Sequence, residues 1–249
     1  MKVQAIQTHR VEVGASLLAL VDRYVPVITE GSVLAITSKV VSVCQGRVID
    51  QNSIAKEALI RQEADAVAQG VESPYGIVLA IKEGILLPSA GIDESNADHT
   101  YILYPANVQD VAVELWHHLR QRHRVKRLGV LITDSHTTPM RRGVMGIALG
   151  WCGFAPLHSY VGKPDLYGRP LRVSQANVLD ALAAAAVFVM GEGSEQTPLA
   201  LLQDLPQVTF MDQPPIPAEV TDIRIPMHED LYAPLLMGVQ WAKPAASEE

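Results

Sequence analysis

The segment Leu131–Gly150, LITDSHTTPMRRGVMGIALG, indicates the fold class and points to a functional site. An apolar run at residues 128–132 leads into Asp134 and Ser135, and a turn is expected at Thr137–Pro139. In α/β proteins, a buried strand that ends in oxygen-bearing side chains is a common way to build a metal or phosphate site. The segment therefore predicts a mixed α/β protein with such a site at the end of a strand.

Two arginines, Arg141 and Arg142, follow this turn and precede a glycine-rich segment at Gly143–Gly150. A guanidinium group matches the oxygens of phosphate or carboxylate, and bare backbone amides also receive phosphate. Two simpler interpretations stay open. The arginines could form surface ion pairs, and the glycines could serve packing, because their spacing matches neither a P-loop nor GxGxxG.

Two more turns contain acidic residues and glycines after an apolar segment. They are GIDESN at Gly91–Asn96 and MGEGSEQ at Met190–Gln196. A single aspartate in a turn is most often a local cap. Several such turns after apolar segments favour one hard-cation site assembled from distant pieces, binding Mg²⁺ or Mn²⁺. The predicted metal ligands are Asp93, Asp134, Ser135 and Glu192.

Three other features have both a functional and a structural interpretation. His136 is either a general base or ligand, or an ordinary loop residue. The basic end of a helix expected at Val108–Arg122 either steers phosphate or is a solvated helix end. The loop Gly162–Leu171 is either a lid over the site or a structured Ω-type loop.

The apolar periodicity predicts strands at residues 3–6, 33–37, 101–104 and 128–133, and the β-branched segment 38–46 continues the second strand or forms another. Helices are expected over 15–24, 53–69, 108–122 and 174–190, with Ser53 and Ser174 as caps. Residues 77–81 and 85–87 read as a hairpin around Lys82-Glu83-Gly84. After Gly193 the chain is proline-rich, so we expect an irregular segment with a short helix near residues 231–239.

The composition is that of a globular enzyme, with 249 residues that are 48% hydrophobic and 19% charged. A net charge of −7 argues against a nucleic-acid binder, and the longest apolar run, Ala181–Met190, is too short to span a bilayer. Two widely separated cysteines, Cys44 and Cys152, predict neither a disulfide framework nor structural zinc. With no signal-like N-terminus, the expected location is cytoplasmic.

Five segments, occurring in the same order across nearly the whole chain, resemble the coenzyme F420-0:γ-glutamyl ligases. They are SKVVSVCQGR (38–47), SAGIDESN (89–96), ITDS through RRGVMGIALG (132–150), GKPDLYGRPL (162–171) and MGEG (190–193). Such ordered agreement is more specific than any single motif. The chain is identified on this basis as a member of that family.

The resemblance implies a mixed α/β protomer in an intertwined homodimer, formed by one domain or by two interleaved subdomains over residues 1–249. It also implies a metal- and GTP-dependent ligase that joins L-glutamate to an acceptor carboxylate, with ATP as the other possible nucleotide. Activation through an acyl phosphate would suit this reaction. By resemblance, the nucleotide contacts are Ser38, Lys39, Asn96, Gly191, Glu192, Gly193 and Ser194. Asp134, Arg141 and Arg142 are the expected catalytic residues, the arginines holding the acceptor.

Two departures from the family pattern bear on the acceptor. Val43 stands where the family usually carries a lysine, and His136–Pro139 replaces a turn of the Asn-Gly-Arg or Phe-Gly-Arg type. This version resembles the folate-metabolism γ-glutamate ligase branch, so the sequence favours a folate acceptor, with F420-0 as the alternative. A non-catalytic nucleotide-binding protein is a further alternative. A flavin-binding C-terminal extension is not expected.

Overall fold

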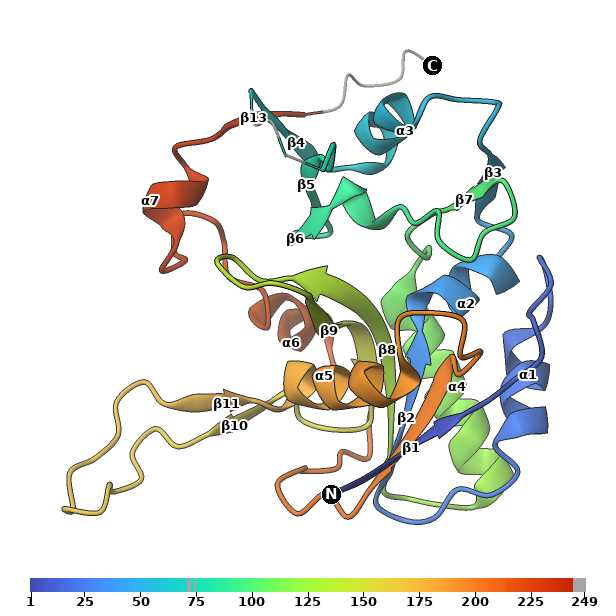
Figure 1. Cartoon of the computed structure of the whole chain (residues 1–249). Helices are drawn as coiled ribbons and strands as arrows, with labels where there is room; N and C mark the ends of the chain where they lie inside the picture. Colours follow the sequence, from blue (N-terminus) through green and yellow to red (C-terminus); the bar gives the residue numbers. More distant parts are fainter. Residues whose placement is uncertain (71–72, 74, 244–249) are drawn as a thin grey trace.

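A five-stranded sheet forms the centre of this computed structural model, which describes residues 1–70, 73 and 75–243 (Figure 1). The strand order is β1 (Lys2–Ile6), β12 (Leu199–Gln203), β2 (Ser32–Thr37), β8 (Leu128–Thr137) and β9 (Val144–Cys152). β2 and β8 are parallel, with Thr37 opposite Thr133, and the other neighbours are antiparallel. Residues 38–39 and 134–135 therefore emerge side by side at one edge of the sheet.

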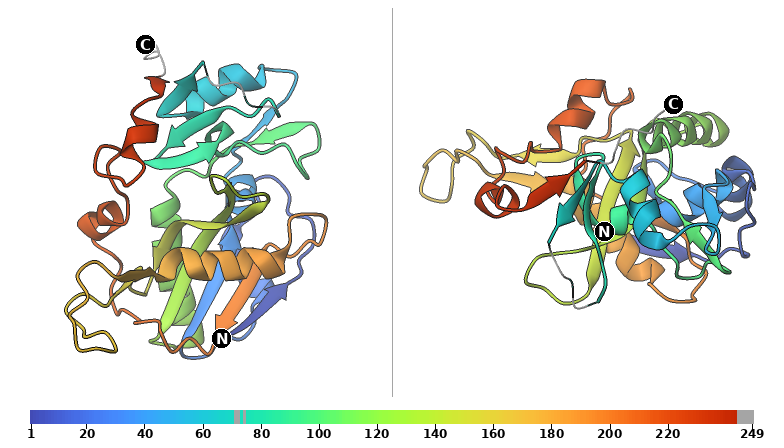
Figure 2. Two further views of the ribbon diagram at one scale, coloured as in Figure 1. Left: turned by 60° about the vertical axis from the view of Figure 1, so that its left-hand side comes forward. Right: turned by 90° about the horizontal axis from the view of Figure 1, so that it is seen from above.

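Helices cover both faces of this sheet (Figure 2). The strand β2 alternates Leu34 and Ile36 toward α1 (Leu17–Tyr24), α2 (Ser38–Cys44) and α4 (Val108–His123), and Val33 and Ala35 toward α5 (Val178–Met190). All four β2 side chains are fully buried. Burying a leucine or isoleucine contributes about 1.5–3 kcal/mol, so this two-sided burial anchors the strand at the centre.

A smaller four-stranded sheet lies above the main sheet in Figure 1, in the order β13 (Gln240–Ala242), β4 (Ala66–Gln69), β5 (Leu79–Lys82) and β6 (Ile85–Pro88). It confirms the predicted hairpin, whose turn residues Glu83 and Gly84 have positive φ as a tight primed turn requires. The same part of the chain contains α3 (Lys56–Glu63) and the paired strands β3 (Val48–Asp50) and β7 (Thr100–Ile102).

The strands β10 (Leu157–Ser159) and β11 (Gln175–Asn177) form an arm whose connecting loop projects away from the body (Figure 1). The remaining helices are α6 (Pro217–Asp222) and α7 (Ala233–Leu236). Among the helices of the described residues, none is both long enough and apolar enough to cross a membrane.

Two predicted elements in the first half of the chain were wrong. Residues 38–44 form the helix α2 instead of a strand, because a short β-branched run follows no diagnostic period and here packs onto β2 and β8. The helix expected over 53–69 is only α3, and its N-cap is Ala55 instead of Ser53. The helix ends because Ala64 adopts an extended backbone conformation, and residues 66–69 then form β4, which pairs with β5.

Two boundaries and one missed strand in the second half also differ from the prediction. β8 does not end at Thr133 but pairs with β9 as far as Thr137, so the turn lies beyond it. The helix α5 begins at Val178, and Asn177, instead of Ser174, caps it by accepting from the amide of Asp180. The proline-rich segment contains β12, a strand whose apolar run LALL is too short to distinguish from a loop or helix by pattern.

Gly146 and Gly150 serve packing, which confirms the simpler of the two interpretations left open by the sequence. Both lie inside β9. A Cβ at Gly146 would meet the carbonyl oxygen of Ala183 at 2.3 Å, and one at Gly150 would meet the carbonyl oxygen of Val108 at 2.9 Å. These glycines let α5 and α4 approach the two faces of the same strand.

The substitution Gly146→Ala should destabilise the protein by about 1–3 kcal/mol, because backbone atoms of α5 would have to move. Gly238→Ala is the matched control, since its Cβ would come no closer than 3.4 Å to any neighbour. Urea unfolding of the two variants provides the comparison. Equal midpoints would show that β9 and α5 are not in the close contact described here.

Candidate active site

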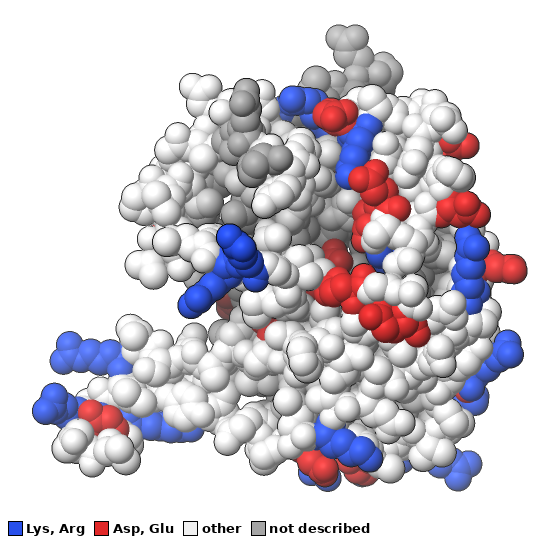
Figure 3. Space-filling model, in the orientation of Figure 1, with Lys and Arg blue, Asp and Glu red and all other residues white. Residues whose placement is uncertain are grey.

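A cavity of about 1150 Å³ opens between the main sheet and the small sheet. Five segments distant in sequence line it: residues 8–13, the start of α2, the loop 91–100, the end of β8, and the loop 191–198. Acidic side chains gather around a hollow on this face (Figure 3). The segment 8–13 carries no recognisable motif, and sequence reasoning missed it.

Lys39 and Asp93 form the centre of the polar end of this cavity. The Lys39 Nζ lies 2.7 Å from Asp93 Oδ2, and it also donates to the Ser95 Oγ at 2.9 Å. Burial acts to raise the pKa of Asp93, but the hydrogen bond and charge of Lys39, together with the hydrogen bonds of Ser95, outweigh it and hold that pKa below its ordinary value. Asp93 is therefore a carboxylate that already has a cation. Sequence reasoning found both residues but neither their contact nor the role of Ser95.

The backbone before Asp93 is held in an uncommon conformation. Ser89 and Ala90 are buried and have φ of 50° and 54°, and Gly91 follows with φ of 73°. Left-handed residues other than glycine are costly and persist where the surroundings impose them, often at functional sites. The loop that carries Asp93 is thus fixed in place from its first residue.

Asp134 lies beside this pair, on the face of β8 that points to α2. Ser38 donates a hydrogen bond to its carboxylate, as does the amide of Ser135 at 2.9 Å. Burial and the nearby charge of Asp93 nevertheless raise the pKa of Asp134 to about 6. Two carboxylates served mainly by one lysine leave an excess of negative charge here, which a cation would relieve.

Ser135 points to the opposite face of the strand, as successive strand residues must. Its hydroxyl donates to both carboxylate oxygens of Glu192, at 2.7 and 2.9 Å. The next residue of that loop, Gly193, accepts a hydrogen bond from the Asn96 side chain at 2.9 Å. The loop 191–198 is thereby tied to both β8 and the Asp93 loop.

The four predicted metal ligands are therefore arranged as two pairs, Asp93 with Asp134 and Ser135 with Glu192. Within the described residues, no three Asp, Glu, His or Cys side chains gather closely enough to hold an ion by themselves. The oxygen donors still fit Mg²⁺ or Mn²⁺, because Mg²⁺ typically takes one or two carboxylates and completes its shell with water and substrate phosphates.

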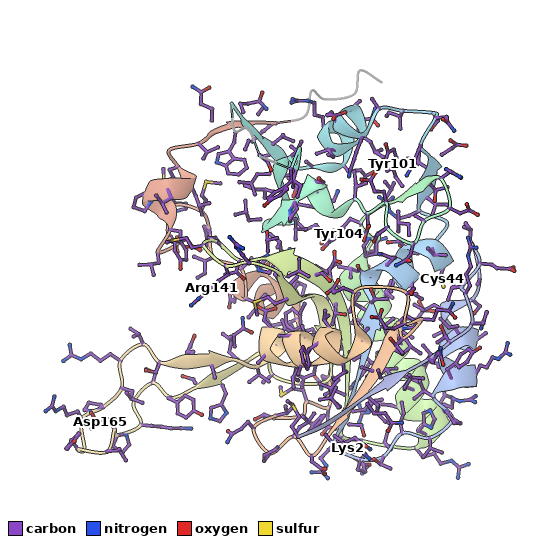
Figure 4. The ribbon with its side chains drawn as sticks, in the orientation of Figure 1. Lys2, Cys44, Tyr101, Tyr104, Arg141 and Asp165 are labelled. Atoms are coloured by element: carbon purple, nitrogen blue, oxygen red, sulfur yellow. The ribbon has the colours of Figure 1, made fainter. Side chains whose placement is uncertain are left out.

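Most of the predicted nucleotide contacts lie at this cavity. Ser38 is bonded to Asp134, and the others line the wall: Lys39, Asn96, Gly191, Glu192, Gly193 and Ser194. The structure does not bring Arg141 and Arg142 to them. Both arginines are exposed in the turn between β8 and β9, and Figure 4 shows Arg141 at the outer end of that hairpin.

The other candidate features lie outside this cavity. His136 is a residue of β8 instead of a loop, and burial lowers its pKa. The loop Gly162–Leu171 is part of the arm and does not reach the cavity of its own chain; Figure 4 shows Asp165 at the arm's far end. In the basic helix end, Arg122 and His118 contact Asp22, which supports the structural interpretation.

Comparison with known proteins identifies the family of this chain. The family model F420-0:Gamma-glutamyl ligase matches residues 5–204, which include every element lining the cavity. The chain belongs to this ligase family. The coenzyme F420:L-glutamate ligase of Methanopyrus kandleri is 35% identical over 195 residues, covering 71% of this chain and 76% of that protein. Ligases of the same name from Archaeoglobus fulgidus and Methanocaldococcus jannaschii are 34% and 31% identical, with the same coverage.

The family assignment establishes this chain as a γ-glutamyl ligase that forms an amide with glutamate. It favours the alternative acceptor, F420-0, over the folate that the two sequence departures had favoured. One of these departures, Val43, does line the cavity. The other, His136–Pro139, lines the cavity at Thr137 but not at His136.

The raised pKa of Asp134 predicts a pH-dependent stability of the metal-free protein. The folded pKa of about 6 exceeds the ordinary aspartate value of 3.8, because burial disfavours the charged carboxylate. The folded state is therefore favoured at a pH below 3.8, and it loses this advantage as the pH rises through 6. The stability of Asp134→Asn relative to wild type should therefore increase by up to about 3 kcal/mol between pH 4 and 7.5. Urea unfolding in EDTA measures this difference. A pH-independent difference between the two proteins would show that the Asp134 carboxyl has an ordinary pKa.

Proposed function

We propose that this chain is a GTP- and divalent-metal-dependent ligase that joins L-glutamate to the carboxylate of F420-0. The observation that carries the proposal is the Asp93–Asp134 pair with Lys39 at one end of a large cavity. Amide formation from a carboxylate in water needs activation, commonly as an acyl phosphate, which requires an anionic nucleotide beside a cation. The family membership and the names of the relatives support glutamate and F420-0 as substrates.

In this proposal the chain's own residues bind and orient the reactants. Asp93 and Asp134 would hold Mg²⁺ or Mn²⁺, and Ser135 and Glu192 would offer further oxygen ligands on the other face of β8. The cation, when bound, neutralises charge that develops on the transferred phosphoryl group. Lys39 and the loop 191–194 contact the nucleotide, and Ser38 orients Asp134 through its hydrogen bond. Cavity walls exclude bulk water from the activated carboxylate.

Paired reactions analysed by mass spectrometry test the acceptor. With L-glutamate, Mn²⁺ and GTP, F420-0 should gain the mass of one glutamate and GTP should become GDP, whereas a folate or pteroate acceptor should stay unchanged. A gain on the folate alone would reverse the acceptor assignment, and ATP in place of GTP tests the nucleotide. Binding of GTP and metal without any product would favour a non-catalytic nucleotide-binding protein.

Asp134→Asn should lower the rate of this reaction more than about 100-fold, since it removes a proposed ligand together with its charge. Asp212→Asn is the control, because that carboxylate is 84% exposed and lies outside the cavity. Full activity of the Asp134 variant at saturating Mn²⁺ would remove Asp134 from the proposed ligand set.

The homodimer belongs to the same proposal and gives the arginines a role. Arg141 and Arg142 extend from their own body, as does the arm with its exposed Leu166 and Tyr167. Apolar side chains exposed on a projecting arm are typical of a surface that another chain covers. A second copy placed there would let the arginines reach the acceptor in the neighbouring cavity.

Mixing two inactive variants tests this arrangement. The Asp134→Asn variant has an impaired cavity but intact arginines. The double variant R141Q/R142Q has an intact cavity but lacks the arginines. If the arginines act in the neighbouring copy, co-refolded mixtures should recover up to about one quarter of wild-type activity, because half of the chains form mixed dimers and one of their two sites is intact. Sedimentation velocity should give twice the mass of the chain. A monomer, or no recovery on mixing, would contradict the shared site.

A further inference from the structure

The ammonium group of Lys39 is enclosed by oxygens in a way that resembles a bound metal ion. It contacts a carboxylate oxygen of Asp93 at 2.7 Å, the Ser95 hydroxyl at 2.9 Å and the Ser95 carbonyl at 3.3 Å. The other carboxylate oxygen of Asp93 accepts from the amide of Ser95 at 2.7 Å. The carboxylate is thus occupied on both oxygens by the chain's own donors.

Carboxylate, hydroxyl and carbonyl oxygens are also the donors that hard divalent cations take. An ammonium group and a divalent cation on the same carboxylate repel each other strongly at contact distance, because both are positive, so they compete for it. With its other oxygen held by the Ser95 amide, Asp93 can bind a metal ion well only if its contact with Lys39 is weakened or lost. The Lys39 side chain is 28% exposed, so it has room to leave.

We propose that Lys39 is a built-in countercation, which holds Asp93 and its loop in the metal-free protein and is displaced when a divalent cation binds. This inference rests on the proposed function, which places the metal at Asp93 and Asp134. Displacement also releases an ammonium group inside the cavity, where the nucleotide phosphates are proposed to bind. Metal binding would then strengthen nucleotide binding, and by linkage the nucleotide would strengthen metal binding.

The chain offers a matched control in Lys56. Its Nζ lies 2.9 Å from a carboxylate oxygen of Glu94, the residue next to Asp93, and its side chain is 29% exposed. It contacts the same loop through the same kind of ion pair, yet it is not bound to Asp93. Lys56→Met therefore removes an equivalent charge from the loop without vacating the proposed metal ligand.

Titration with Mn²⁺, followed by loss of the free-ion electron paramagnetic resonance signal, tests the proposal without nucleotide or turnover. Lys39→Met should bind Mn²⁺ about three- to tenfold more tightly than wild type, the range expected for removing one partly exposed competing ion pair. Lys56→Met and Lys39→Arg, which keeps the charge, should bind as wild type does. Mn²⁺ should also raise the melting temperature of Lys39→Met by more than that of wild type, which shows that the variant is folded.

The outcomes separate this inference from the proposed function. If wild type binds Mn²⁺ and Lys39→Met binds it equally or more weakly, Lys39 is not a countercation, but the proposed metal site is retained. Equal tightening by Lys56→Met overturns the countercation role too, since the effect would then be one of general charge. Absence of Mn²⁺ binding in all variants overturns the proposed metal site and this inference together.

Discussion

The parallel pairing of β2 with β8 is the constraint on which the rest of the structure depends. Both strands are buried on their two faces and run in register, with Thr37 beside Thr133. Because the two strands run parallel and in register, the residues beyond Thr37 and Thr133 lie side by side at the same edge of the sheet. One strand delivers Ser38 and Lys39, and the other delivers Asp134 and Ser135. The remaining loops need only to cover an edge that is already polar and already placed.

The alternation of side chains along a strand places two neighbouring residues of the site on opposite faces of the sheet. Asp134 and Ser135 are neighbours, but alternation along β8 sends one toward α2 and the other toward the loop after α5. The electrostatics follow this division. On one face, a lysine balances one of two carboxylates and the second is left with a raised pKa. On the other face, a hydroxyl satisfies an exposed carboxylate. The site is thus two polar clusters joined by one strand, not a single acidic cage.

Sequence reasoning recovered β1, β2 and β8 of the main sheet, the helices α1, α4 and α5, and the polar residues at one end of the cavity, because these depend on local pattern and on motifs with ordered spacing. It failed where tertiary packing decides. The segment 38–44 has the composition of a strand and becomes a helix, and LALL at 199–202 becomes a central strand without any periodic signal. The arginines at 141 and 142 looked like site residues because they follow Asp134 closely, but the hairpin carries them away from the cavity of their own chain. Whether residues 1–249 act as one domain or as two interleaved ones stays a prediction.

The position of β12 sets the order in which this protein is able to assemble. β1 pairs only with β12 in the part of the chain that the structure describes, and β12 also forms one side of β2. During synthesis the main sheet therefore remains incomplete until residue 203 has been made, although most of its strands are present long before. The loop 191–198 leads directly into this strand, so the cavity wall closes in the same event that completes the sheet. A nascent chain stopped before β12 would leave one edge of the buried strand β2 unpaired, which makes that edge prone to aggregation.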